Sequence, residues 1–301
     1  MKAVFDEEIA RTIGCLDRVP ARYRRFSEHS DKALRFHRIP ESVLERLLDG
    51  GMPHAKSAGA IMFDVNDLKT VVLRLGIASP QHTALKAMAD ALKRAARQKE
   101  TRCTVNILGR CVGPTHDGPC AYGLSGRVRE SPYVQELREL APQHFEATVR
   151  LPAGDPFHFD LSPAGRRLVT EVLSFEFHHI PDALTRDLTF LADAGISDCR
   201  LATHFLYTRG KELGLDIRKA AGIFLSRPFS NTHCWIEFKA SGEWRPADPF
   251  FLTALSRWGI LDPAEWPVHR SPEGAYWKLS TELESYVTHQ GVGQLPSFLT
   301  R

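Results

Sequence analysis

Three residues whose side chains together support nucleophilic catalysis occur in the carboxy-terminal half of this 301-residue chain: Cys199, His233 and Asp248. A thiolate attacks a carbonyl carbon, an imidazole takes and returns the proton, and a carboxylate orients the imidazole. The stretch between Cys199 and His233 is long enough for a helix and a strand. The stretch between His233 and Asp248 is long enough for one hairpin. The three side chains can therefore meet in one site.

The residues around Cys199 predict that it lies in the first turn of a helix. Ser197 or Asp198 can cap that helix, apolar residues recur at helical spacing behind the cysteine, and Gly214 ends the pattern. Backbone N–H groups at a helix start, together with the helix dipole, favour the thiolate form of a thiol. We therefore expect Cys199 to be a nucleophile.

His233 lies in a stretch that alternates like a strand, following an expected strand at 220–225. Cys234, Ile236 and Phe238 share one face, which we expect to be core, and His233 lies on the other. On this basis Cys234 is a small buried residue and not a second nucleophile.

Asp248 ends the next predicted strand, after a turn at Ser241 and Gly242. An antiparallel hairpin brings this strand beside the one that carries His233, so a carboxylate can fix the imidazole tautomer. The alternative to a catalytic role is that Cys199 is a core cysteine, His233 a surface histidine and Asp248 a residue that forms a turn before Pro249. The joint arrangement favours the catalytic interpretation.

Three short motifs occur in order within about residues 190–250: G-x-x-D-C at the helix start, H-x-W-x-E on the strand and W-x-P-x-D-P after it. Together they resemble the transglutaminase-like superfamily, which has a papain-like fold. The resemblance implies Cys199 as nucleophile, His233 as base and acid, and Asp248 as the orienting carboxylate. Calcium-dependent crosslinking members have tryptophan where this chain has Arg200, so crosslinking is not expected, and residues 1–160 match nothing in that family.

The predicted reaction is acyl transfer through an acyl-enzyme, on an amide, ester or thioester. The second nucleophile is water in a peptidase or amidase and an amine in an acyltransferase. An amide-forming transferase that uses carrier-protein thioesters in small-molecule biosynthesis is the alternative that the resemblance implies. A non-catalytic binding module of the same fold is the second alternative.

Substrate contacts are expected from Trp235, Glu237 and Trp244, which flank the predicted site. Glu237 shares a strand face with His233, and a solvated edge charge is an equal interpretation of it. All five tryptophans lie in the last quarter of the chain, where they can wall a pocket or simply fill a core.

A second group of metal-binding residue types, Cys103, Cys111, His116 and Cys120, lies near a glycine-rich loop at 109–132. Their spacing matches no common zinc motif, so we expect scattered thiols and no metal site. No glycine-rich loop has the strand-then-helix context that binds phosphate. The sequence thus predicts no cofactor.

The predicted fold class is α+β. We expect a mostly helical amino-terminal lobe at 1–150 and a transglutaminase-like catalytic domain at 151–301, in which a helix bearing the cysteine packs on an antiparallel sheet. Helices are predicted at 40–48, before Gly50 and Gly51, and from Ser79 and Pro80 onward.

The composition and net charge of the chain limit the classes of binding partner that we expect. Hydrophobic residues make up 43% and charged residues 25% of the chain, with a net charge of +3, so neither disorder nor a nucleic-acid or membrane partner is indicated. The positive charges from Lys86 to Arg102 suit a solvated helix face or, as the alternative, an acidic carrier protein. An acidic amino terminus and six sparse cysteines favour a cytoplasmic protein with free thiols.

Overall fold

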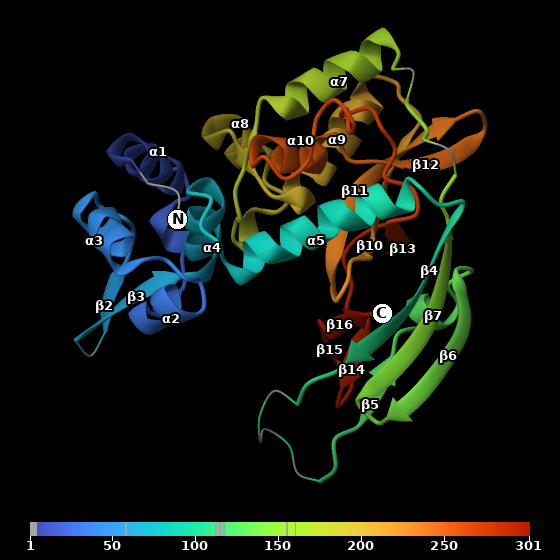
Figure 1. Ribbon diagram of the computed structural model, residues 1–301, viewed down its shortest axis with the longest axis horizontal. Coiled ribbons are helices and arrows are strands. Elements are labelled where there is room, and N and C mark those ends of the chain that lie inside the picture. The colour runs from blue at the N-terminus through green and yellow to red at the C-terminus, as the bar shows by residue number, and fades with distance from the viewer. Residues whose placement is uncertain are drawn as a thin grey trace. The chain divides into compact units, whose positions relative to one another are not determined.

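The protein has a mixed α+β fold in a computed structural model that describes residues 5–57, 59–111, 113, 116, 118–154, 156–159 and 161–301 (Figure 1). The chain forms two compact units. The first comprises residues 1–86, 167–206 and 249–266, and the second comprises 87–166, 207–248 and 267–301. The boundary expected near residue 150 falls inside the second unit. The proline- and glycine-rich stretch there ends a strand and does not mark a change of unit.

The amino-terminal part of the first unit combines helices with a small antiparallel sheet of order β1-β3-β2. Its elements are α1 (Asp6–Leu16), β1 (Phe26–His29), α2 (Ser30–Arg35), α3 (Glu41–Asp49), β2 (Ala55–Ser57), β3 (Ala60–Asp64) and α4 (Val65–Arg74). The helix predicted at 40–48 is confirmed as α3, and Gly51 continues the chain at φ +93°. The three strands were not predicted, because strands of three to five residues leave too short a pattern to read.

The remainder of the first unit surrounds an apolar cluster. This cluster includes Cys15, Ile180, Leu191, Ile196 and Leu201. The elements of this part of the unit are most of α7 (Pro163–Leu173), then β8 (Glu176–Phe177), α8 (Leu188–Ala194), β9 (Ile196–Ser197), the start of α9 (Cys199–Glu212) and α10 (Pro249–Arg257). Strands β8 and β9 pair in parallel. The predicted helix bearing the cysteine is confirmed as α9.

An eight-stranded antiparallel sheet dominates the second unit, in the order β13-β10-β11-β16-β4-β7-β6 with β12 paired to β11. Its strands are β4 (Glu100–Leu108), β6 (Val134–Ala141), β7 (His144–Pro152), β10 (Ile217–Phe224), β11 (Phe229–Ala240), β12 (Glu243–Ala247), β13 (Tyr276–Ser280) and β16 (Ser297–Thr300). Figure 1 shows β4, β7 and β6 side by side as long arrows. Strand β11 pairs with β16 near its start and with β12 near its end, so it links the two halves of the sheet.

Smaller elements of the second unit lie in the predicted glycine-rich segment and near the carboxy terminus. They are β5 (Tyr122–Leu124), α6 (Gly126–Arg129), β14 (Val287–His289) and β15 (Val292–Gln294), and the three strands form a sheet of order β15-β14-β5. Residues 112, 114, 115 and 117 of the predicted loop lie outside the described residues. The helix predicted from Ser79 and Pro80 is confirmed as α5 (Pro80–Ala95).

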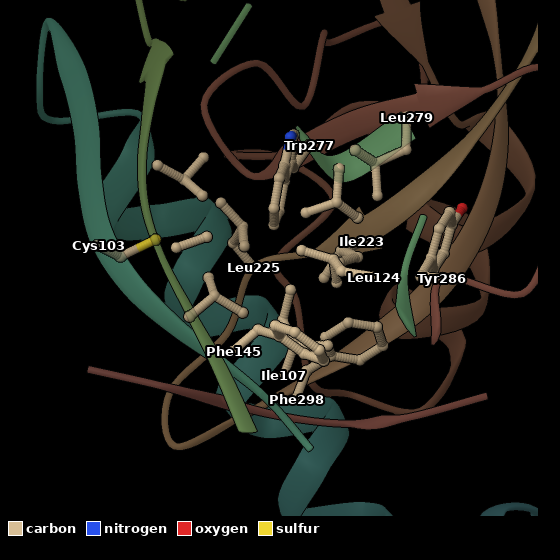
Figure 2. Packing of buried hydrophobic residues seen from close by; sticks show 14 of the residues in the cluster. Cys103, Ile107, Leu124, Phe145, Ile223, Leu225, Trp277, Leu279, Tyr286 and Phe298 are labelled. Carbon is tan, nitrogen blue, oxygen red and sulfur yellow. The ribbon is translucent and has the colours of Figure 1, made fainter. Parts of the chain in front are cut away.

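The core of the second unit packs the faces of β4, β7, β10 and β13 against one another (Figure 2). Trp277 is fully buried there, and its Nε1 donates a hydrogen bond to Ser131 Oγ at 2.9 Å. Gly222 on β10 lies against this tryptophan, because a Cβ at that position would stand 2.0 Å from the Trp277 carbonyl oxygen. The close approach of β13 thus requires glycine at 222.

Among the residues that the structure describes, no helix is both long and apolar enough to cross a membrane.

Candidate functional site

Asp198 caps the helix that begins at Cys199. Its Oδ1 accepts the backbone N–H groups of Arg200 at 2.9 Å and Leu201 at 3.1 Å, two of the donors that a helix start leaves unsatisfied. Burial raises the pKa of this carboxyl group, while the guanidinium of Arg200 opposes that rise. Cys199 therefore occupies the first helical position behind a well-formed cap, as the sequence predicted.

Arg200 places a positive charge next to Cys199. Burial disfavours its charged form, but Asp198, Asp182 and the thiolate of Cys199 together raise the pKa of the guanidinium. Its Nη2 also lies 2.7 Å from Asp198 Oδ2 and donates to the carbonyl oxygen of Ile180 at 3.1 Å. A cation beside a thiol favours its thiolate form in general.

His233 and Asp248 form a buried hydrogen-bonded pair in the second unit. The imidazole Nε2 lies 2.6 Å from Asp248 Oδ2, and the two side chains are only 4% and 5% exposed. Strand pairing explains the contact, since Ile236 on β11 faces Ala247 on β12 and Asp248 follows directly. The sequence prediction that these two side chains lie together is confirmed.

The hairpin between β11 and β12 turns at Ser241 (φ +50°) and Gly242 (φ +85°), as the sequence predicted. Positive φ at both central residues characterises the two-residue turn whose twist matches its strands. The turn fixes the register, and the register determines which residue faces His233.

Tyr276 is a third member of this group that the sequence analysis missed. Its hydroxyl donates to Asp248 Oδ2 at 2.8 Å, and its ring lies 5.3 Å from that of His233. Tyr276 begins β13, which pairs with β10, and β10 pairs in turn with β11. Only the strand order brings it near, so no local pattern could have revealed it.

The predicted substrate-binding residues Trp235, Glu237 and Trp244 line one cavity of about 290 Å³ in the second unit. Tyr276 lines it too, and the rings of both Tyr276 and Trp235 contact the His233 ring. Trp235 is 1% exposed, and its Nε1 has no hydrogen-bond partner among the described residues. The indole N–H of Trp235 is therefore a buried donor without a protein acceptor among the described residues.

Glu237 is buried, with 6% of its surface exposed, so the interpretation of it as a solvated edge charge is wrong. Its carboxylate forms ion pairs with Arg218, directly opposite on β10, and with Lys278 on β13. Both faces of β11 are buried from His233 to Phe238. The face that carries His233 and Glu237 is therefore covered in the same way as the apolar face.

The other cysteines divide into buried and loop thiols. Cys234 is 7% exposed, as predicted for a core residue. Burial raises the pKa of Cys15, and it raises that of Cys103 to about 11, so neither is a nucleophile near neutral pH. Cys199 is partly exposed.

The loop residues were expected to be scattered thiols, and that expectation is wrong for three of the four. Cys111, His116 and Cys120 gather with His289, so that one ligand atom from each lies within 4.8 Å of the others. Cys103 lies apart, in the core. The sequence did not reveal this cluster, because His289, which completes the set, is distant in sequence.

Cys199 belongs to the first unit and the pair of His233 and Asp248 to the second. The pairing of the thiol with the imidazole therefore stays a prediction. In comparisons with known proteins, neither a family model nor a curated protein matches this sequence.

Proposed function

We propose that this protein catalyses thiol-dependent acyl transfer, with Cys199 as nucleophile, His233 as base and acid, and Asp248 as the orienting group. The observation that carries the proposal is the buried hydrogen bond between His233 and Asp248, which a second donor, the Tyr276 hydroxyl, reinforces. A buried aspartate on an imidazole nitrogen orients the ring and stabilises the imidazolium that forms during proton transfer.

The choice of nucleophile rests on the surroundings of Cys199. The thiol begins a fourteen-residue helix, has the Arg200 guanidinium beside it and is partly exposed. Asp198 accepts the N–H groups of Arg200 and Leu201, so these two groups are engaged by the cap and do not serve as oxyanion donors.

The two reaction steps exchange bonds at one carbonyl carbon. The Cys199 thiolate forms a C–S bond with the acyl carbon, and the bond to the leaving nitrogen, oxygen or sulfur breaks as imidazolium donates its proton. The second nucleophile then loses a proton to His233, attacks the thioester and restores the thiolate. Asp248 holds Nε2 of His233, so Nδ1 transfers the proton.

The cavity lined by Trp235, Glu237 and Trp244 is the proposed substrate pocket. Trp235 and Trp244 supply aromatic surface to this pocket. The ion pairs of Glu237 with Arg218 and Lys278 neutralise its charge, so the pocket needs no cationic substrate. A peptide or acyl group fits this chemistry. A carrier-protein thioester as donor, and an amine instead of water as acceptor, remain alternative outcomes.

The proposal is tested by measuring turnover of activated esters and thioesters by the full chain and by Cys199→Ala, His233→Ala and Cys234→Ala. We expect the first two variants to lose activity by about 1,000-fold or more, with near-ultraviolet circular dichroism unchanged. Cys234→Ala is the matched control and keeps activity, because Cys234 is a buried core thiol. If Cys199→Ala turns over substrate as fast as Cys234→Ala, the proposal is wrong.

A further inference from the structure

The cluster of Cys111, His116, Cys120 and His289 is built by pairing of distant segments. Cys120 lies two residues before Tyr122, which faces His289 in the β5–β14 pairing, and the Gln290 N–H donates to the Ala121 carbonyl oxygen at 2.8 Å. Strand pairing therefore fixes Cys120 and His289 with respect to each other.

The distances within the cluster match a tetrahedral metal site. His116 Nε2 lies 3.6 Å from the sulfur of Cys111 and 3.6 Å from that of Cys120. A tetrahedral zinc ion, with Zn–S bonds of about 2.3 Å and Zn–N bonds of about 2.0 Å, separates a sulfur and a nitrogen ligand by about 3.5 Å. Since all four ligand atoms lie within 4.8 Å of one another, the widest pair needs to close by no more than about 1.5 Å.

His289 provides an independent sign that a ligand belongs here. It is 7% exposed, and its Nε2 has no hydrogen-bond partner among the described residues. A buried imidazole nitrogen with no partner loses its interaction with water and gains nothing in return. Its ring contacts that of His116, with the centroids 4.8 Å apart, and one of its ring nitrogens lies within 4.8 Å of the other ligand atoms, so an ion held there would give the buried imidazole a partner.

The orientation of His116 is held from outside the cluster. The Gln290 side-chain amide lies 3.1 Å from Nδ1 of His116 and donates to the Pro119 carbonyl oxygen at 3.0 Å. With Nδ1 engaged, Nε2 faces the two sulfur atoms. A partner on the outer nitrogen is the usual support of a metal-bound histidine.

We propose that Cys111, His116, Cys120 and His289 form a structural zinc site. Two thiolates balance the charge of the ion, and sulfur with imidazole is the donor set that tetrahedral Zn²⁺ takes in proteins. Four protein ligands leave no position for substrate, so the ion ties Cys111, His116 and Cys120 to the end of β14 and has no part in acyl transfer. Binding releases the protons of whichever ligands are protonated.

The full chain is purified with reductant, and bound metal is measured by plasma mass spectrometry after exchange into metal-free buffer. We expect about one zinc ion per chain, and cobalt substitution should give the visible bands of a tetrahedral ion with thiolate charge transfer in the ultraviolet. Cys111→Ser, Cys120→Ser and His289→Ala should each weaken zinc binding by at least about 100-fold. Cys103→Ala is the matched control and should keep full metal content.

Two results would overturn the assignment. The first is an unaltered chain that retains no zinc after loading and exchange and gives no tetrahedral cobalt spectrum. The second is a disulfide between Cys111 and Cys120, seen as a mass lower by two hydrogens in protein purified without reductant and then loaded with zinc. The measurements on the unaltered chain decide the question even if a variant fails to fold.

Discussion

Substitution of Gly222 tests the close approach of β13 to β10 in the sheet that carries His233. An alanine Cβ there would lie 2.0 Å from the Trp277 carbonyl oxygen and 3.0 Å from the Leu279 nitrogen. Both atoms are backbone, so no side-chain rotation relieves the clash, and β13 must move away from β10.

The cost of Gly222→Ala follows from that movement. Overpacking of a core costs roughly 1–3 kcal/mol, and each backbone hydrogen bond lost between β10 and β13 adds about 1 kcal/mol. We expect the free energy of unfolding of the second unit to fall by about 3 kcal/mol. Activity should fall as well, because β13 carries Tyr276 and its hydrogen bond to Asp248.

The assay is urea unfolding followed by near-ultraviolet circular dichroism, which reports the environment of buried tryptophans such as Trp277. Gly154→Ala is the matched control, since Gly154 lies in the same unit and a Cβ there meets nothing within 4 Å. It should change the unfolding free energy by less than about 0.5 kcal/mol. Equal unfolding midpoints for the two variants would refute the close approach of β13.

Three further predictions concern the site and the first unit. Tyr276→Phe should lower turnover by about tenfold, and Asp248→Asn by more, since an amide still orients His233 but cannot offset imidazolium charge; steady-state kinetics with equal rates for both variants would count against the pairing. Cys234→Ala should cost about 1 kcal/mol in chemical denaturation, and a gain in stability would contradict its core position. Burial and nearby cations lower the pKa of His178 to about 3. Unfolding releases the ring to an ordinary pKa near 6.5, so stability should fall as pH drops below 6.5, by about 1.4 kcal/mol per unit, and His178→Leu should flatten that slope in melts at pH 5 and 7.

Local patterns predicted the elements around the candidate site well. The capping residue Asp198, the terminator Gly214 and the turn at Ser241 and Gly242 each act within a few residues, so their effect could be read from adjacent positions. The pairing of His233 with Asp248 followed from one hairpin. These predictions rest on backbone chemistry that tertiary context did not override.

Long-range pairing could not be predicted in the same way. Tyr276 reaches Asp248 only because β13 joins β10, and His289 reaches the cysteine loop only because β14 pairs with β5. The burial of Glu237 depends on Lys278, a residue from another strand. A strand pattern shows which face is apolar and does not show which strand will cover it.

The role of Cys199 as the nucleophile is tested most directly by mass spectrometry of the full chain after brief exposure to a simple thioester, with and without an added amine. We expect one acyl group per chain, located on Cys199 by peptide mapping and absent from His233→Ala at the same exposure time. Persistence of the adduct until an amine arrives identifies a transferase, and rapid release as the free acid identifies a hydrolase. Failure of Cys199 to form an adduct with any thioester or activated ester, or equal acylation of His233→Ala, would contradict the claim.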